Sequence, residues 1–159
     1  MLWATFKWNQ CTDLVPLDDD SLAPRKGVLS WVFENLYRSF LPTIVGNGDI
    51  FMHDSVGPYR GYIVLQVLRE LGIQVMAWPP YSPDLNPIEN LWSIMKREIY
   101  KNHPELEHAP DTQETLMALV AAAQESWHNI DQEILSRLAL TMPHRVAAVI
   151  EAEGWYTKY

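Results

Sequence analysis

Cysteine, long apolar runs and basic residues are all scarce in this sequence. Cys11 is the only cysteine among 159 residues, which excludes an intramolecular disulfide and a zinc site built from several thiolates. The longest apolar run is eight residues, Leu116 to Ala123, far below the roughly 20 that span a bilayer. The first ten residues also lack the basic and then apolar order of a secretory signal. We therefore expect an intracellular protein without a membrane partner.

The charge balance is acidic. Twelve Lys and Arg stand against 20 Asp and Glu, which gives a formal net charge of −8. Spread evenly, this charge would repel a phosphate backbone, so a nucleic-acid partner would require either a local basic patch or bound divalent cations. The 48% hydrophobic content indicates a packed core rather than disorder, and the length fits one compact domain.

The first half of the sequence alternates between strand and helix patterns. Residues 2–8 and 12–17 are typical of a hairpin. Apolar spacing predicts a helix over 24–41, with Pro42 after its end, and a second helix over 62–71 that Gly72 ends. Short apolar runs at 49–53 and 73–78 are typical of buried parallel strands. This order predicts an α/β fold, whose ligand site lies at the carboxyl ends of the parallel strands.

The second half is dominated by helix patterns. A stiff loop over 78–87 contains four prolines, and helices are predicted over 88–100, 112–127, 131–138 and 143–153. Pro104 and Pro110 make 103–111 the best candidate linker. We therefore divide the chain into a core over 1–103 and a helical part of the same domain over 104–159, which either completes the core or binds a partner.

Two carboxylates are placed where they could share a site. Asp54 follows the strand predicted at 49–53, and Glu89 lies in the first turn of the helix after the stiff loop. Oxygen ligands of this kind suit Mg²⁺ or Mn²⁺. Each carboxylate also has a structural alternative. Glu89 could form a capping box with Asn86, and Asp54 could cap a helix beginning near Tyr59.

Three cations form the densest basic group of the chain. Lys96, Arg97 and Lys101 follow Glu89 on the same predicted helix, and Lys96 projects within about 20° of Glu89 at 100° per residue. They could form a short strip that binds nucleic-acid phosphates. The alternative is a solvated helix face whose cations lie near the carboxyl end of the helix dipole.

Several segments resemble the catalytic domain of Tc/mariner superfamily transposases. They are FMHD at 51–54, GIQV at 72–75, WPPYSPDLNPIENLW at 78–92, MPHR at 142–145, VI at 149–150 and GWYTKY at 154–159. The segment at 78–92 is the most specific, because chance agreement over fifteen consecutive positions is negligible. The resemblance covers nearly the whole chain.

The resemblance implies a ribonuclease H-like fold, a mixed sheet flanked by helices, with extra helices at the carboxyl end. It also implies an aspartate, aspartate and glutamate (or aspartate) triad that uses Mg²⁺ or Mn²⁺ to cut and join DNA. Asp54 matches the second aspartate and Glu89 the third acid, with the 34 residues 55–88 between them, a separation that the family uses. Transposon ends and target DNA would be the partners, a homodimer is an open alternative, and the nucleus would be the location.

The chain also departs from the family pattern. The segment beginning at Leu2 resembles the family's second strand, so we expect the first strand and the first aspartate to fall before Met1. Ser55 and Tyr59 stand where the family usually has asparagine and histidine, and no helix-turn-helix modules are present. We therefore expect a catalytic-domain fragment that is inactive alone. The alternative hypothesis is a non-catalytic transposase remnant, or a domain co-opted for nucleic-acid or protein interactions.

Overall fold

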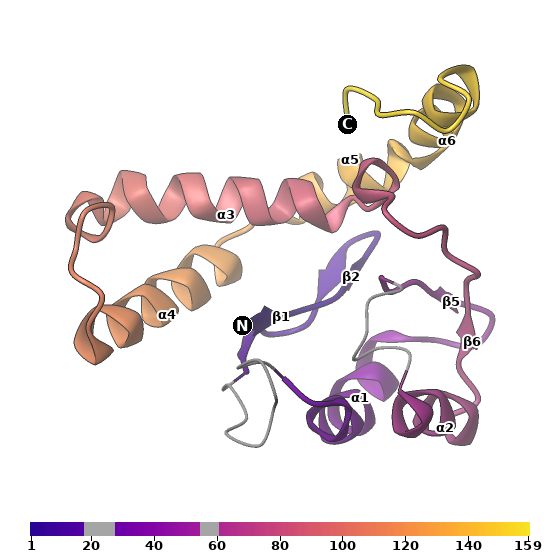
Figure 1. Cartoon of the computed structure of the whole chain (residues 1–159), viewed down its shortest axis with the longest axis horizontal. Helices are drawn as coiled ribbons and strands as arrows, with labels where there is room; N and C mark the ends of the chain where they lie inside the picture. The colour runs from indigo at the N-terminus through magenta and orange to yellow at the C-terminus, as the bar shows by residue number, and fades with distance from the viewer. Residues whose placement is uncertain (18–27, 55–60) are drawn as a thin grey trace. The chain divides into compact units, whose positions relative to one another are not determined.

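The computed structural model describes residues 1–17, 28–54 and 61–159 (Figure 1). The backbone forms two compact units. The first contains Met1–Leu2 and Leu17–Tyr81, and the second contains Trp3–Pro16 and Ser82–Tyr159. In these described ranges, no helix is long and apolar enough to cross a membrane.

The first unit is built on two helices that pack side by side, α1 (Ser30–Ile44) and α2 (Tyr62–Glu70) (Figure 1). Apolar residues recur every three or four positions in both, so each helix presents one apolar face to the core. Their buried side chains are Phe33, Leu36, Tyr37, Leu41, Ile44, Val64, Val67 and Leu68. Gly72 follows α2 with a φ of +67°, a conformation that glycine adopts without steric cost. The predicted end of this helix is confirmed.

Each of these helices leads into a short strand, β5 (Ile50–Phe51) after α1 and β6 (Gln74–Val75) after α2. The two strands are parallel, with Ile50 opposite Gln74 and Phe51 opposite Val75. The Met76 amide adds a hydrogen bond to the Phe51 carbonyl at 2.9 Å. The predicted parallel arrangement is therefore confirmed, and α2 lies in the crossover between the paired strands.

Several element boundaries differ from those predicted. The strands are shorter than 49–53 and 73–78, because only two residues of each are paired in the parallel ladder. The helix predicted over 24–41 begins at Ser30, and residues 18–27 lie outside the described residues. Pro42 is inside α1, not after it. In the last turn a proline removes one intrahelical hydrogen bond without ending the helix, and the Val45 amide still donates to the Leu41 carbonyl at 2.8 Å.

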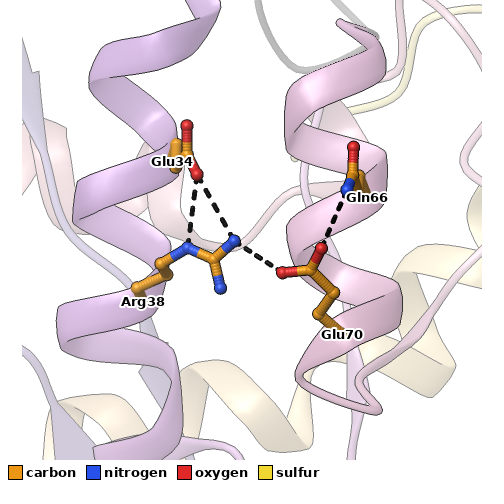
Figure 2. Close-up of polar contacts among 4 residues, drawn as sticks. All are labelled: Glu34, Arg38, Gln66 and Glu70. Atoms are coloured by element: carbon orange, nitrogen blue, oxygen red, sulfur yellow. Dashed lines mark hydrogen bonds and ion pairs between the residues drawn. The ribbon is translucent and has the colours of Figure 1, made fainter.

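An exposed polar network links α1 to α2 (Figure 2). Arg38 Nη2 on α1 donates to Glu70 Oε2 on α2 at 2.6 Å and to Glu34 Oε1 at 3.3 Å. Gln66 Nε2 donates to the other Glu70 oxygen at 2.9 Å. The bond from Arg38, followed by that from Gln66, lowers the pKa of Glu70. Because these groups are exposed, the network adds little to stability and mainly favours one alignment of the two helices.

The second unit begins with the predicted hairpin. β2 (Phe6–Lys7) pairs antiparallel with β3 (Gln10–Cys11), and β1 (Leu2–Trp3) pairs with β4 (Val15–Pro16). Thr12 closes the gap between the two pairs, because its amide donates to the Thr5 carbonyl at 2.9 Å and its hydroxyl accepts from the Thr5 amide at 3.0 Å.

Helices make up the rest of the second unit. They are α3 (Ile88–Asn102), α4 (Gln113–His128), α5 (Gln132–Leu140) and α6 (Met142–Glu151), with the 3-10 helices η2 (Pro83–Leu85) and η3 (Pro104–Leu106). α3 packs along α4 (Figure 1). Between these helices the rings of Trp92 and Trp127 stack with their centroids 5.0 Å apart. The four helices predicted from the sequence are confirmed, whereas the division of the chain at residue 103 stays a prediction.

The hairpin is fastened to α4 and α5 by side chains distant in the sequence. Trp127 Nε1 donates to the Thr12 carbonyl at 2.8 Å, and Gln124 Nε2 donates to the Leu14 carbonyl at 3.1 Å. The Ser136 hydroxyl on α5 donates to the Trp8 carbonyl at 2.9 Å. These bonds give the hairpin carbonyls hydrogen-bond partners within the protein, without which they would need water or remain unpaired.

Candidate active site

Asp54 lies three residues after the end of β5, in the first unit. Its side chain is half-buried. The neighbouring His53 ring stacks on Phe51 at 5.6 Å and meets Tyr37 edge-on at 6.3 Å. Burial lowers the pKa of His53, and the charge of Asp54 partly offsets that effect. His53 is therefore a packed ring next to Asp54, in contact with Phe51 and Tyr37.

The structural alternative for Asp54 is wrong. α2 begins at Tyr62, its N-cap is Gly61, and no side chain caps it. Asp54 is therefore not the cap of this helix. Ser55 and Tyr59, the two departures from the family pattern, lie outside the described residues.

Glu89 lies in the first turn of α3, in the second unit. The chain reaches it through η2 and then Pro87, whose fixed φ suits the start of a helix. The Glu89 amide donates to the Asn86 carbonyl at 3.2 Å, which begins the helix. The carboxylate is exposed, and among the described residues it has no hydrogen bond or ion pair. Glu89 therefore presents an unengaged carboxylate at the positive end of a helix dipole.

The capping box proposed for Glu89 is also wrong. The N-cap of α3 is Pro87 rather than Asn86, and no side chain caps the helix. The Oδ1 atom of Asn86 is buried and has no hydrogen-bond partner in the described part of the chain. A proline side chain has no oxygen to accept from the first turn, so the reciprocal bonds of a capping box do not form.

The loop before Glu89 is held by a buried arginine that sequence reasoning missed. Arg145 on α6 donates from Nη1 to the Asp84 carbonyl at 2.8 Å and from Nη2 to Asn90 Oδ1 at 2.5 Å. Asp84 is itself buried, and its carboxylate accepts a hydrogen bond from the Thr157 amide. The available sequence signal was an arginine that precedes the apolar run 146–150 inside a predicted helix.

The three basic residues of the sequence analysis all lie on α3 with Glu89, and their side chains are exposed. Lys101 Nζ is engaged, because it pairs with Glu98 at 3.0 Å. Among the described residues, Lys96 and Arg97 form no ion pair. These two cations are therefore available to an external anion, whereas Lys101 is partly neutralised.

The donor chemistry fits a divalent cation only in part. Asp54 and Glu89 offer oxygen atoms, which Mg²⁺ and Mn²⁺ prefer. They belong to different units, and the described residues contain no group of three or more His, Cys, Asp or Glu that could hold a metal ion. Mg²⁺ commonly binds through one or two carboxylates, several waters and substrate phosphates, so two carboxylates are sufficient protein ligands for it.

Comparison with known proteins decides the family. The sequence profile described as DDE superfamily endonuclease matches residues 30–111, more than half of the chain, and the match includes both Asp54 and Glu89. The chain belongs to the DDE endonuclease superfamily.

Its relatives include Tc1/mariner transposases. The chain is 28% identical to the Tcb2 transposase of Caenorhabditis briggsae over 159 residues, which is 100% of this chain and 54% of that protein. It is 30% identical to the Tc1 transposase of Caenorhabditis elegans over 128 residues, which is 80% of this chain and 44% of that protein. The chain therefore spans about half the length of these DDE transposases.

The fold of this DDE protein is similar to that of the catalytic domain of Mos1 mariner transposase. The likeness has a TM-score of 0.62 at 19% identity and covers 99% of this chain and 82% of that one. This confirms the ribonuclease H-like α/β fold that the sequence resemblance implied.

Proposed function

We propose that this chain is the metal-dependent catalytic part of a Tc1/mariner-type DNA transposase, with Asp54 and Glu89 as metal ligands. The observation that carries the proposal is the superfamily match across both residues, joined to the loss of their structural alternatives. Glu89 does not cap α3 and Asp54 does not cap α2, so a capping role accounts for neither carboxylate.

The proposed cofactor is Mg²⁺ or Mn²⁺. Structures of the Mos1 catalytic domain have been described with each of these ions, which supports the same choice here. When bound, such an ion would activate a water or hydroxyl for attack on a phosphodiester and stabilise the leaving oxygen. The contribution of the chain is to hold two carboxylates on stiff supports: the packed backbone after β5 and the first turn of α3.

The proposed substrate is DNA, namely transposon ends and a target. Mos1 transposase has been described in a paired-end complex with a left transposon end, which supports a DNA partner for this relative. In this chain Lys96 and Arg97 would meet the phosphates, and Lys101 would do so at the cost of its pair with Glu98. The nucleus is the location proposed from this function, and a homodimer remains an open alternative.

We expect the 159 residues alone to bind metal without joining DNA strands. The family triad needs a third carboxylate, and none of Asp13, Asp18, Asp19, Asp20 and Asp49 matches the position of its first member. A strand-transfer assay on the isolated chain tests this expectation. Metal-dependent joining that is lost in both Asp54→Asn and Glu89→Gln would show that the chain is complete enough for catalysis.

The direct test is Mn²⁺ binding to the whole chain by calorimetry, with folding checked by circular dichroism. We expect Asp54→Asn and Glu89→Gln each to weaken binding by at least about tenfold, since even indirect support of a metal ligand is worth that much. Glu107→Gln, the same change at another exposed carboxylate, is the matched control and should bind like the unaltered chain. A folded chain that binds no Mn²⁺ would contradict the proposal and favour a non-catalytic remnant.

A further inference from the structure

Among the described residues, Arg145 is the largest one that is fully buried, and only 2% of its surface is exposed. A buried guanidinium is costly unless its donors are paired, and here each of its three nitrogens donates one hydrogen bond. Nε donates to the Thr141 hydroxyl at 2.8 Å, Nη1 to the Asp84 carbonyl at 2.8 Å and Nη2 to Asn90 Oδ1 at 2.5 Å. The Tyr159 ring covers the group at 4.8 Å.

These partners lie on both sides of the turn that leads into α3. Asp84 belongs to η2, five residues before Glu89, and Asn90 is the residue directly after Glu89. One rigid, planar group therefore bridges the loop and the first turn of the helix. The same group is anchored to its own helix by Thr141, the N-cap residue of α6.

Among the described residues, the other side-chain bond to the first turn of α3 runs from the Ser93 hydroxyl of the next turn to the Glu89 carbonyl at 3.0 Å. No side chain caps the helix, and the Asn86 side chain offers no bond from within the described residues. The amides of Glu89 and Asn90 donate to the Asn86 and Pro87 carbonyls at 3.2 Å, which is long for such bonds. Both hydrogen bonds of the Arg145 bridge, at 2.8 Å to the Asp84 carbonyl and 2.5 Å to Asn90 Oδ1, are shorter than these two amide bonds.

The acceptors of Arg145 show that its charge does not serve an ordinary ion pair. It bonds to a carbonyl, an amide oxygen and a hydroxyl, and the Asp84 carboxylate is used by Thr157 instead. Burial lowers the pKa of Arg145, while the charges of Tyr159 and Asp84 oppose that shift. Because all three acceptors are uncharged, the planar geometry of the Arg145 guanidinium matters more at this position than the neutralisation of its charge.

We propose that Arg145 is a positioning residue for Glu89, holding the junction between η2 and α3 so that the Glu89 carboxylate points at the metal. This rests on the proposed role of Glu89 as a metal ligand. Because Arg145 is buried and its nitrogens bond within the protein, we expect it to act through this junction and not by touching the ion or the DNA. A lysine cannot replace it, because one ammonium cannot reach the loop carbonyl and the Asn90 amide in the same planar arrangement.

The test compares Arg145→Lys with Asn90→Ala in the whole chain. Arg145→Lys keeps the positive charge and loses the planar group that bonds to both Asp84 and Asn90. Asn90→Ala removes the bond to Asn90 Oδ1 and leaves the buried arginine in place. Arg137→Lys, the same change at an exposed arginine of α5, is the matched control. Mn²⁺ affinity and amide hydrogen exchange at Glu89 and Asn90 are measured in each, with α1 amides as an internal reference.

We expect Arg145→Lys to weaken Mn²⁺ binding by about tenfold or more and Asn90→Ala to weaken it in the same direction. Both should speed exchange at Glu89 and Asn90 and leave the α1 amides unchanged, and Arg137→Lys should alter neither readout. If Arg145→Lys fails to fold, the Mn²⁺ affinity and hydrogen exchange of Asn90→Ala test the inference alone. Unchanged Mn²⁺ affinity in the folded variants would overturn the inference.

Failure of the proposed function gives a different pattern. If the unaltered, folded chain binds no Mn²⁺, Glu89 is not a ligand in it, and the exchange data alone decide whether Arg145 fixes the first turn of α3. Faster exchange at Glu89 and Asn90 would support the placement of the turn by Arg145. Unchanged exchange would overturn that placement as well.

Discussion

Replacing Trp127 by phenylalanine should destabilise the chain far more than the same change at Trp155. Trp127 is 2% exposed, and its indole N–H donates to the Thr12 carbonyl at 2.8 Å. Phenylalanine keeps an aromatic ring against Trp92 but has no donor. A buried acceptor left without its donor costs about 1–3 kcal/mol.

The smaller ring adds a cavity cost to this loss. Complete removal of a buried Trp side chain costs about 3–5 kcal/mol, so the shrinkage to phenylalanine should cost only a fraction of that. Together the two effects predict a loss of about 2–4 kcal/mol in the free energy of unfolding for Trp127→Phe. Trp155 is 74% exposed, and its replacement should change the free energy by less than about 0.5 kcal/mol.

Urea unfolding followed by far-ultraviolet circular dichroism measures both variants without relying on tryptophan fluorescence, which the substitution itself would change. The unfolding midpoint should fall for Trp127→Phe with an unchanged slope, because the same surface is exposed on unfolding. Equal losses in the two variants would refute the reasoning, since they would show that neither burial nor the bond to Thr12 sets the cost.

Two further predictions concern the exposed charges. Lys96→Ala and Arg97→Ala should each reduce the slope of log affinity against log salt concentration by about 0.9 when duplex DNA binding is measured by fluorescence anisotropy. Lys101→Ala should reduce this slope less, because Glu98 already pairs with that lysine. Unchanged slopes for the first two variants would show that α3 is not part of the DNA-binding surface. The pKa of Glu70 is lowered in the folded state, so its contribution to stability is complete above its ordinary value of about 4.5 and is lost as the pH falls through the lowered one. Glu70→Gln should therefore lower the melting temperature slightly at pH 7, and this difference should shrink as the pH falls below about 4.5; a difference that grows in acid would contradict this origin.

Local patterns predicted the elements of this fold well. Gly72 marked the end of α2 because only its positive φ allows the chain to turn at once into β6. Apolar spacing identified α3 to α6, since each helix buries one face. The conspicuous loop over 78–87 also drew attention to Glu89, which lies inside the superfamily match, and its role as a metal ligand stays a prediction.

Errors arose where a residue's role depends on its neighbours in space. Local pattern alone predicts Pro42 just after the helix end, whereas the last turn of α1 tolerates the loss of one hydrogen bond and includes it. The Asn86 and Glu89 spacing fits a capping box, but Pro87 begins the helix in its place. Arg145 could not be predicted as buried, because its partners Asp84 and Asn90 are 61 and 55 residues away.

The attachment of the amino-terminal hairpin to α4 also sets an order of events during synthesis. Thr12 leaves the ribosome long before Trp127, and the bond between them spans 115 residues. At about 5–20 residues per second, the hairpin waits for about 6–23 s before the helix that completes its packing exists. Until then Trp3 and Leu14, both buried in the finished fold, stay exposed to solvent or to other chains. Translation speed and chaperone supply should therefore influence the soluble yield of this chain.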